Sequence, residues 1–125
     1  MLKGLWSMEV MSPEGGISAA GVLVFYPCKV FGDFFEDGQI LGGDRNYLYA
    51  GDYMIENYGV SGDIEVVHYA DDTHPSFGPE KSFRIKFSGE LDHLVDREVL
   101  QFSAERPDDP TQQWSLRLIR RKQLT

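Results

Sequence analysis

Apolar and polar residues alternate along most of this 125-residue chain. The clearest example is the segment 82–88, where Phe83, Ile85 and Phe87 alternate with Arg84 and Lys86. Successive side chains of a β-strand point to opposite faces, so a period of two predicts strands. The same period recurs at residues 5–10, 17–26, 47–54, 60–69, 100–105 and 114–118. The pattern therefore predicts an all-β domain.

Two of these segments carry additional information about their surroundings. At residues 47–54, Tyr47, Tyr49, Gly51 and Tyr53 share one face, while the other face is mixed. At residues 22–26 both faces are apolar. An apolar side chain at every position is typical of a strand that is covered on both sides, so we expect this strand to be central or covered.

Residues that favour turns separate the strands. They cluster at residues 12–16, 37–38, 42–44, 61–63, 71–75, 78–79 and 106–110. We expect Gly42 and Gly43 to need positive φ or close backbone approach, and Asp44 to cap the turn with its side chain. Residues 90–98 have helical spacing but are long enough for a short helical turn at most.

This organisation predicts one domain over residues 1–125 with about eight strands in sequence order. An antiparallel up-and-down sheet of that size usually closes into a barrel, because closure removes the exposed edges. A β-sandwich would give a similar sequence pattern and is the alternative. An eight-stranded barrel has an interior just wide enough for packed side chains or one small ligand.

The charge balance narrows the range of partners. The net charge of −8 argues against nucleic acid as a ligand. The last nine residues contain Arg117, Arg120, Arg121 and Lys122 and no acid, whereas the first 116 hold 8 basic and 20 acidic residues. This basic end is either a solvated strand end, a site for an acidic partner, or a segment that lies across the acidic surface of its own chain.

Other features indicate a cytoplasmic protein. Cys28 is the only cysteine, so it cannot form an intramolecular disulfide, which fits a reducing compartment. Its apolar neighbours predict a small buried side chain. The first residues do not resemble a signal peptide, and no apolar run is long enough to span a membrane. We therefore expect no membrane association.

Catalytic and metal-binding patterns are absent from the sequence. His68, His74 and His93 lie on different segments without a recognised zinc spacing. No nucleophile elbow occurs. The carboxylate pairs at 36–37, 71–72 and 108–109 fall in expected turns, where solvated acids are the default. We expect neither enzymatic activity nor a metal or cofactor.

The aromatic residues have three interpretations. They could fill the core, form a dimer face or line a ligand cavity, since tyrosine is favoured where an apolar ring meets a polar partner. The candidates for a cavity or dimer face are Trp6, Tyr47, Tyr49, Tyr53, Phe83, Phe87, Phe102 and Trp114.

The chain resembles the GrlR-like family of small bacterial regulators, whose named members are negative regulators of type III secretion. The resemblance rests on Gly4-Leu5-Trp6-Ser7, on Gly21-Val22-Leu23-Val24 and on the glycines and tyrosines of residues 42–53. It continues through Val66-x-His68-Tyr69 and Ser76-Phe77-Gly78 and fades after Gly89. The resemblance implies a lipocalin-like eight-stranded barrel, a homodimer, an apolar cavity and action through a partner protein.

The chain departs from the family in one functional segment. The named regulators capture a transcriptional activator with an acidic Glu-Asp-Glu-Asp loop, and the matching segment between Tyr53 and Val66 lacks these four acids. We therefore expect a cytoplasmic bacterial barrel, homodimeric and non-enzymatic, that binds a regulatory protein partner. The alternative is a barrel that binds a small apolar, lipid-like ligand.

Overall fold

The computed structural model describes residues 2–32, 34–70, 80–91 and 98–123 and contains eight strands within them. In chain order the strands are β1 (Gly4–Met11), β2 (Ile17–Phe31), β3 (Phe35–Gly43), β4 (Tyr47–Glu56), β5 (Gly59–His68), β6 (Ser82–Glu90), β7 (Val99–Arg106) and β8 (Asp109–Lys122). None of the described residues forms a helix that is long and apolar enough to cross a membrane.

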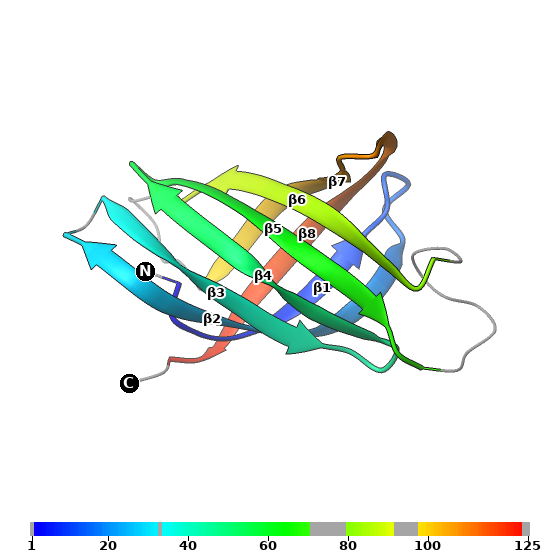
Figure 1. Cartoon of the computed structure of the whole chain (residues 1–125), viewed down its shortest axis with the longest axis horizontal. Helices are drawn as coiled ribbons and strands as arrows, with labels where there is room; N and C mark the ends of the chain where they lie inside the picture. Colours follow the sequence, from blue (N-terminus) through cyan, green and yellow to red (C-terminus); the bar gives the residue numbers. More distant parts are fainter. Residues whose placement is uncertain (1, 33, 71–79, 92–97, 124–125) are drawn as a thin grey trace.

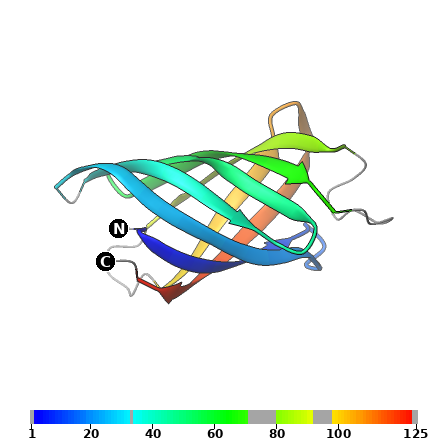
Figure 2. The same cartoon turned by 60° about the horizontal axis from the view of Figure 1, so that its bottom comes forward.

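The strands form a closed antiparallel barrel in which every strand pairs with its neighbours in the sequence (Figures 1 and 2). The pairing of β1 with β8 closes the sheet and joins Met8 to Leu118 in register. This architecture confirms the predicted eight-stranded up-and-down barrel and excludes the sandwich. The shortest ladder is that of β6 and β7, which joins residues 86–88 to residues 103–105.

Strand β3 was not recognised in the sequence, where residues 37–38 and 42–44 were expected to form turns. The structure shows that Gly38 and Gly42 lie inside the strand because the backbone of β2 approaches them closely. A Cβ atom at Gly38 would lie 2.2 Å from the Tyr26 carbonyl oxygen, and one at Gly42 would lie 2.1 Å from that of Val22. These glycines therefore permit close strand packing in the barrel wall rather than a change of direction.

The predicted turn at residues 61–63 is also wrong, since these residues lie within β5. The turn between β4 and β5 is formed instead by Asn57 and Tyr58, both of which have positive φ. Positive φ at both central positions matches the twist of a two-residue hairpin. The tyrosine at the second position gave no turn signal.

Two other predicted turns are confirmed. Ser12 and Gly16 close the β1–β2 turn with a backbone hydrogen bond of 2.8 Å. Pro107 and Asp108 join β7 to β8. The turn predicted at 71–75, the one at 78–79 and most of the helical turn predicted at 90–98 lie outside the described residues; Glu90 is the last residue of β6.

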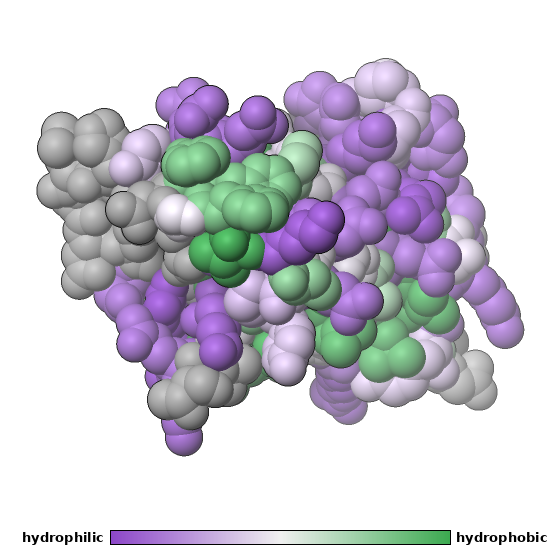
Figure 3. Space-filling view, turned by 60° about the vertical axis from the view of Figure 1, so that its left-hand side comes forward, coloured by the Kyte–Doolittle hydropathy of each residue, from purple (hydrophilic) through white to green (hydrophobic). Residues whose placement is uncertain are grey.

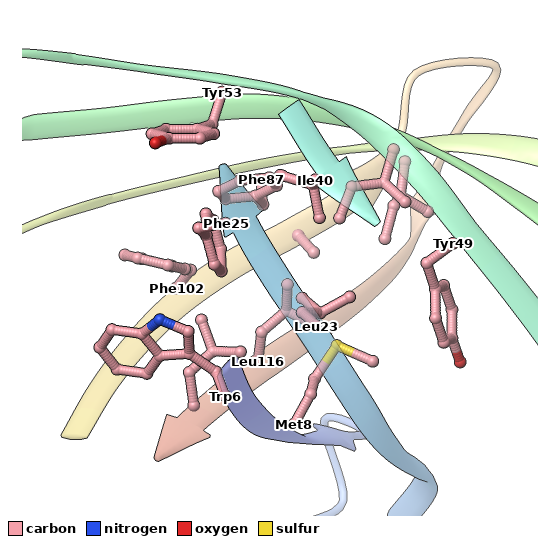
Figure 4. Close-up of a cluster of buried hydrophobic side chains, with 14 of the residues drawn as sticks. Trp6, Met8, Leu23, Phe25, Ile40, Tyr49, Tyr53, Phe87, Phe102 and Leu116 are labelled. Carbon is pink, nitrogen blue, oxygen red and sulfur yellow. The ribbon is translucent and has the colours of Figure 1, made fainter. Parts of the chain in front are cut away.

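The core fills the inside of the barrel. Inward-pointing positions alternate with outward-pointing ones along every strand, as in β4, where Tyr47, Tyr49 and Tyr53 are buried and the residues between them are largely exposed. Figure 4 shows Trp6, Phe25, Phe87 and Phe102 gathered in the interior from β1, β2, β6 and β7. The buried apolar residues of the described strands thus form one continuous core.

Candidate binding surfaces

The predicted aromatic residues form the core of the barrel. Seven of the eight are buried, and Trp114 is partly buried against the same core. Phe25 connects several of them: its ring packs edge-on against Tyr53 at 5.1 Å and Trp6 at 6.2 Å between ring centroids. Phe87 and Phe102 pack at 5.4 Å. Of the three interpretations, the geometry corresponds to core packing.

The packing leaves little empty space inside the barrel. Large inward-pointing side chains from different strands, such as Trp6, Phe25, Tyr53, Phe87 and Leu116, are at most 3% exposed. A hollow of ligand size would leave accessible area on the side chains around it. The interior between the described strands is therefore filled by side chains, as in small barrels without a ligand cavity.

Glu36 is a buried carboxylate at one end of the core, although the sequence indicated a solvated turn acid. It is 2% exposed and accepts hydrogen bonds from the Tyr53 hydroxyl at 2.8 Å and the Leu2 amide at 3.2 Å. The Leu2 carbonyl in turn accepts a 2.9 Å bond from the Trp6 indole. Burial raises the pKa of Glu36, but the hydrogen bonds to its carboxylate outweigh burial and hold the pKa below the usual value. Glu36 thus fastens the segment before β1 to β4.

Asp44 organises the β3–β4 turn, as predicted. One carboxylate oxygen accepts hydrogen bonds from the amides of Asn46 and Tyr47 at 2.8 and 2.7 Å. The other oxygen accepts a 2.5 Å bond from the Tyr49 hydroxyl. Burial and this bond to Asp44 raise the pKa of Tyr49. Asp44 therefore has a structural role that accounts for both of its oxygens.

Arg106 is a second buried charged residue, which sequence reasoning did not find. Its side chain is 8% exposed and makes a two-pronged ion pair with Asp108 at 2.8–2.9 Å, with Glu80 at 3.1 Å from the same guanidinium. The guanidinium also lies over the Phe83 ring, 4.8 Å from its centroid. Hydrogen bonds to Asp108 and Glu80 raise the pKa of Arg106 despite its desolvation. These contacts join the start of β6 to the β7–β8 turn.

The basic end of the chain makes contacts with its own surface. Arg117 pairs with Glu9 at 3.1 Å, and Arg120 lies 3.8 Å from Glu98 and over the Trp6 ring. Arg121 donates a 2.9 Å hydrogen bond to the Ser7 hydroxyl. These residues belong to β8, which pairs with β1 and β7 in the barrel wall, so the segment is the end of a strand whose basic side chains contact neighbouring segments.

Two further expectations concern reactive or metal-binding residues. Cys28 is exposed, so the expectation of a buried cysteine is wrong. It lies at a register shift between Pro27 and Lys29, where β2 has an extra residue opposite β3. Among the described residues, no group of three or more His, Cys, Asp or Glu side chains converges on a point where a metal ion could bind.

One side of the barrel is apolar on its outer surface. Most of the exposed large apolar side chains of the described residues lie between Ile17 and Met54. At the centre are two adjacent cross-strand rows, which we call the apolar side: Val22, Val24, Leu41, Leu48 and Ala50 of β2, β3 and β4. β2 pairs with β1 and β3 and is central, one of the two arrangements expected for it, but it is not covered on its outer face in this chain alone, since Val22, Leu41 and Leu48 are 44–55% exposed. In Figure 3, apolar residues form patches between polar ones on the face shown there.

A groove of about 1,090 Å³ is the second surface feature. Two rows of outward-pointing residues border it, and the members of each row are register partners on successive strands. The first row is Asp37, Met54, Ser61, Ser88, Ser103 and Ser115. The second row is Asp52, Asp63, Lys86, Glu105 and Gln113.

The groove lies on the outside of the barrel. The inward-pointing residues between the two rows include Tyr53, Phe87 and Ala104, which are at most 4% exposed. Their side chains belong to the core, so their backbone forms the floor of the groove. The sequence gave no signal for this site because its residues come from strands far apart in the chain.

No protein-family model matches the chain, and no curated protein matches it. The resemblance to the GrlR-like family stays a prediction, and the candidate sites rest on the geometry alone.

Proposed function

We propose that this protein is a non-enzymatic, homodimeric barrel that acts in regulation by binding another protein. The observation that carries the proposal is the apolar side on β2, β3 and β4. A contiguous apolar patch on an outer sheet surface is typical of a protein–protein contact, because its transfer from water is favourable. The resemblance to bacterial regulators supports the regulatory role.

The filled interior supports binding at the surface rather than inside the barrel. Trp6, Phe25 and the other core residues leave no accessible area from which a buried ligand could be held. The alternative, a carrier of a small apolar ligand, would require several of these side chains to move. That movement would break the packing of the core, at a cost of several kcal/mol.

Charge favours a second copy of this chain as the occupant of the apolar side. The chain has a net charge of −8, so two copies repel over most orientations. The two rows of the apolar side contain no charged residue on β2, β3 or β4. Two copies that face each other there avoid opposing carboxylates and bury Val22, Leu41 and Leu48 of both chains. Such a two-fold contact uses the same patch on each subunit.

Light scattering coupled to gel filtration tests the dimer. The wild-type protein should have twice the 14.2 kDa mass of one chain. Leu41→Asp should give a folded monomer, since it places a charge in the centre of the contact. Gln101→Asp is the matched control, because Gln101 is exposed on β7, outside the apolar side, and its variant should stay dimeric.

A wild-type protein with the mass of one chain at micromolar concentration would contradict the dimer. The regulatory role has its own test, in which the wild-type protein and the Gln101→Asp control are baits for protein partners. Both baits should capture the same protein partner. Mass spectrometry of purified protein after gentle organic extraction tests the carrier. A bound apolar molecule at one equivalent per chain would contradict the proposal and support the alternative.

A further inference from the structure

We propose that the outer groove binds an uncharged, polyhydroxylated chain such as an oligosaccharide. This inference concerns a different surface from the apolar side and goes beyond the proposed protein-binding function. It rests on the size of the groove, on the chemistry of its two walls and on the regular spacing that the strands impose.

The first wall presents four hydroxyl groups in a line. Ser61, Ser88, Ser103 and Ser115 are register partners on β5, β6, β7 and β8, and all four are exposed. Adjacent strands are about 4.8 Å apart, so the hydroxyls repeat at about this interval. Each serine hydroxyl both donates and accepts a hydrogen bond. A linear ligand that repeats its own hydroxyl groups along its length can match such a row.

The second wall contains charged groups of both signs at its centre. Lys86 lies in register between Asp63 on β5 and Glu105 on β7. Asp63 also forms an ion pair with Arg84 at 2.8 Å. The charges in the centre of the groove therefore balance one another locally. The wall offers carboxylate acceptors and one ammonium donor to hydroxyl groups.

The β8 end of the groove adds amide chemistry. At this end, Gln113 carries an amide that both donates and accepts hydrogen bonds. Its neighbour Trp114 is the register partner of Ala104 and packs against the core, so its backbone belongs to the floor of the groove. A few placed polar groups of this kind suit the hydroxyl groups of a sugar ring.

Two protein ligands fit these observations less well. An extended peptide cannot add a strand here, because the groove runs across strands whose backbones are already paired on both sides. A cationic peptide would be attracted to Asp37 and Asp52 at the β3–β4 end, but Lys86 lies among the other carboxylates and the four serines are uncharged. A neutral ligand rich in hydroxyl groups satisfies both walls.

Titration of the ¹⁵N-labelled protein followed by two-dimensional NMR tests the proposal. The probes are the neutral hexasaccharides of cellulose, chitin, amylose and mannan, with hexalysine as the cationic comparison. We expect at least one hexasaccharide to cause saturable shifts in the amides of Ser61, Ser88, Ser103 and Ser115. Hexalysine should leave these amides unchanged.

Paired variants locate the contact. Ser88→Val with Ser103→Val removes two hydroxyls at exposed strand positions where valine is well tolerated, and should weaken binding of that hexasaccharide at least about tenfold. Gln101→Val is the matched control, because Gln101 is exposed on β7 two residues from Ser103 but does not line the groove. It should bind like the wild type.

Three results would overturn the proposal. One is the absence of groove shifts with every hexasaccharide up to its solubility limit. Another is equal binding by the double serine variant when its spectrum shows a folded protein. The third is a response of the groove to hexalysine alone, which would assign it to a cationic peptide. None of them bears on the dimer, since the mass of the Leu41→Asp variant is measured separately.

Discussion

Replacement of Glu36 by glutamine tests whether the buried carboxylate stabilises the barrel. The carboxylate accepts hydrogen bonds from the Tyr53 hydroxyl at 2.8 Å and the Leu2 amide at 3.2 Å. Hydrogen bonds to a charged group contribute about 1.5–3 kcal/mol each. Glutamine keeps one acceptor oxygen but has no charge, so we expect a loss of about 2 kcal/mol at neutral pH.

The effect should depend on pH in one direction. The pKa of Glu36 is lower in the folded protein than its usual value of 4.5. A lowered pKa means that the unfolded chain binds a proton more readily than the folded one. The stabilisation by Glu36 is therefore complete above pH 4.5 and is lost as the pH falls through the folded-state pKa. The Glu36→Gln variant should lack this part of the acid destabilisation.

Urea unfolding followed by tryptophan fluorescence at several pH values between 7 and 3 measures both effects. Glu56→Gln is the control, because Glu56 is exposed on β4, and it should change stability by less than about 0.5 kcal/mol. The reasoning is refuted if Glu36→Gln is as stable as the wild type at neutral pH. It is also refuted if the difference between the two proteins does not shrink in acid.

Three further predictions concern the core, the barrel wall and the buried guanidinium. Phe25→Ala should destabilise the protein by about 3–5 kcal/mol in denaturant unfolding, whereas Tyr26→Ala, at the exposed next position, should cost much less; equal losses would contradict the assignment of faces. Gly42→Ala should lower the melting temperature strongly because its Cβ would overlap the Val22 carbonyl oxygen, and Gly16→Ala, with no atom closer than 3.8 Å, should melt close to the wild type. Arg106→Met should cost about 1–3 kcal/mol because it removes the charged hydrogen bonds and the Phe83 contact of a side chain that is only 8% exposed, while Arg84→Met at a 57% exposed pair should cost less than about 1 kcal/mol; a larger loss at Arg84 would contradict this ranking.

The alternation of apolar and polar residues was sufficient to predict most of the strands and the closed barrel. It succeeded because the inward positions of an isolated barrel face one core, so each strand carries the pattern in its own sequence. The stripe of Tyr47, Tyr49 and Tyr53 is an example: the period predicted that the three share one face, and that face is the buried one. The three interpretations of the aromatic residues could not be separated in the sequence, since a filled and a hollow barrel have the same period.

The errors arose where long-range contacts override the local signal. Glu36, Asp37 and Gly38 have the composition of a turn, but the carboxylate of Glu36 is satisfied by Tyr53 and Leu2 from other segments. Cys28 was expected to be buried, but a register shift beside it alters the alternation of β2. The serine row could not be predicted, because it requires the registers of β5, β6, β7 and β8 together.

The short β6–β7 ladder has a consequence for how the barrel opens. Only residues 86–88 and 103–105 are joined in register there, whereas the other ladders between the described strands are longer. Amide hydrogens exchange with solvent through local opening, and fewer cooperative bonds lower the free energy of opening. The amides of Lys86, Phe87 and Ser88 that bond to β7 should thus exchange faster than those across β3 and β4. The barrel should therefore open first between β6 and β7, while the other strand pairs are still formed.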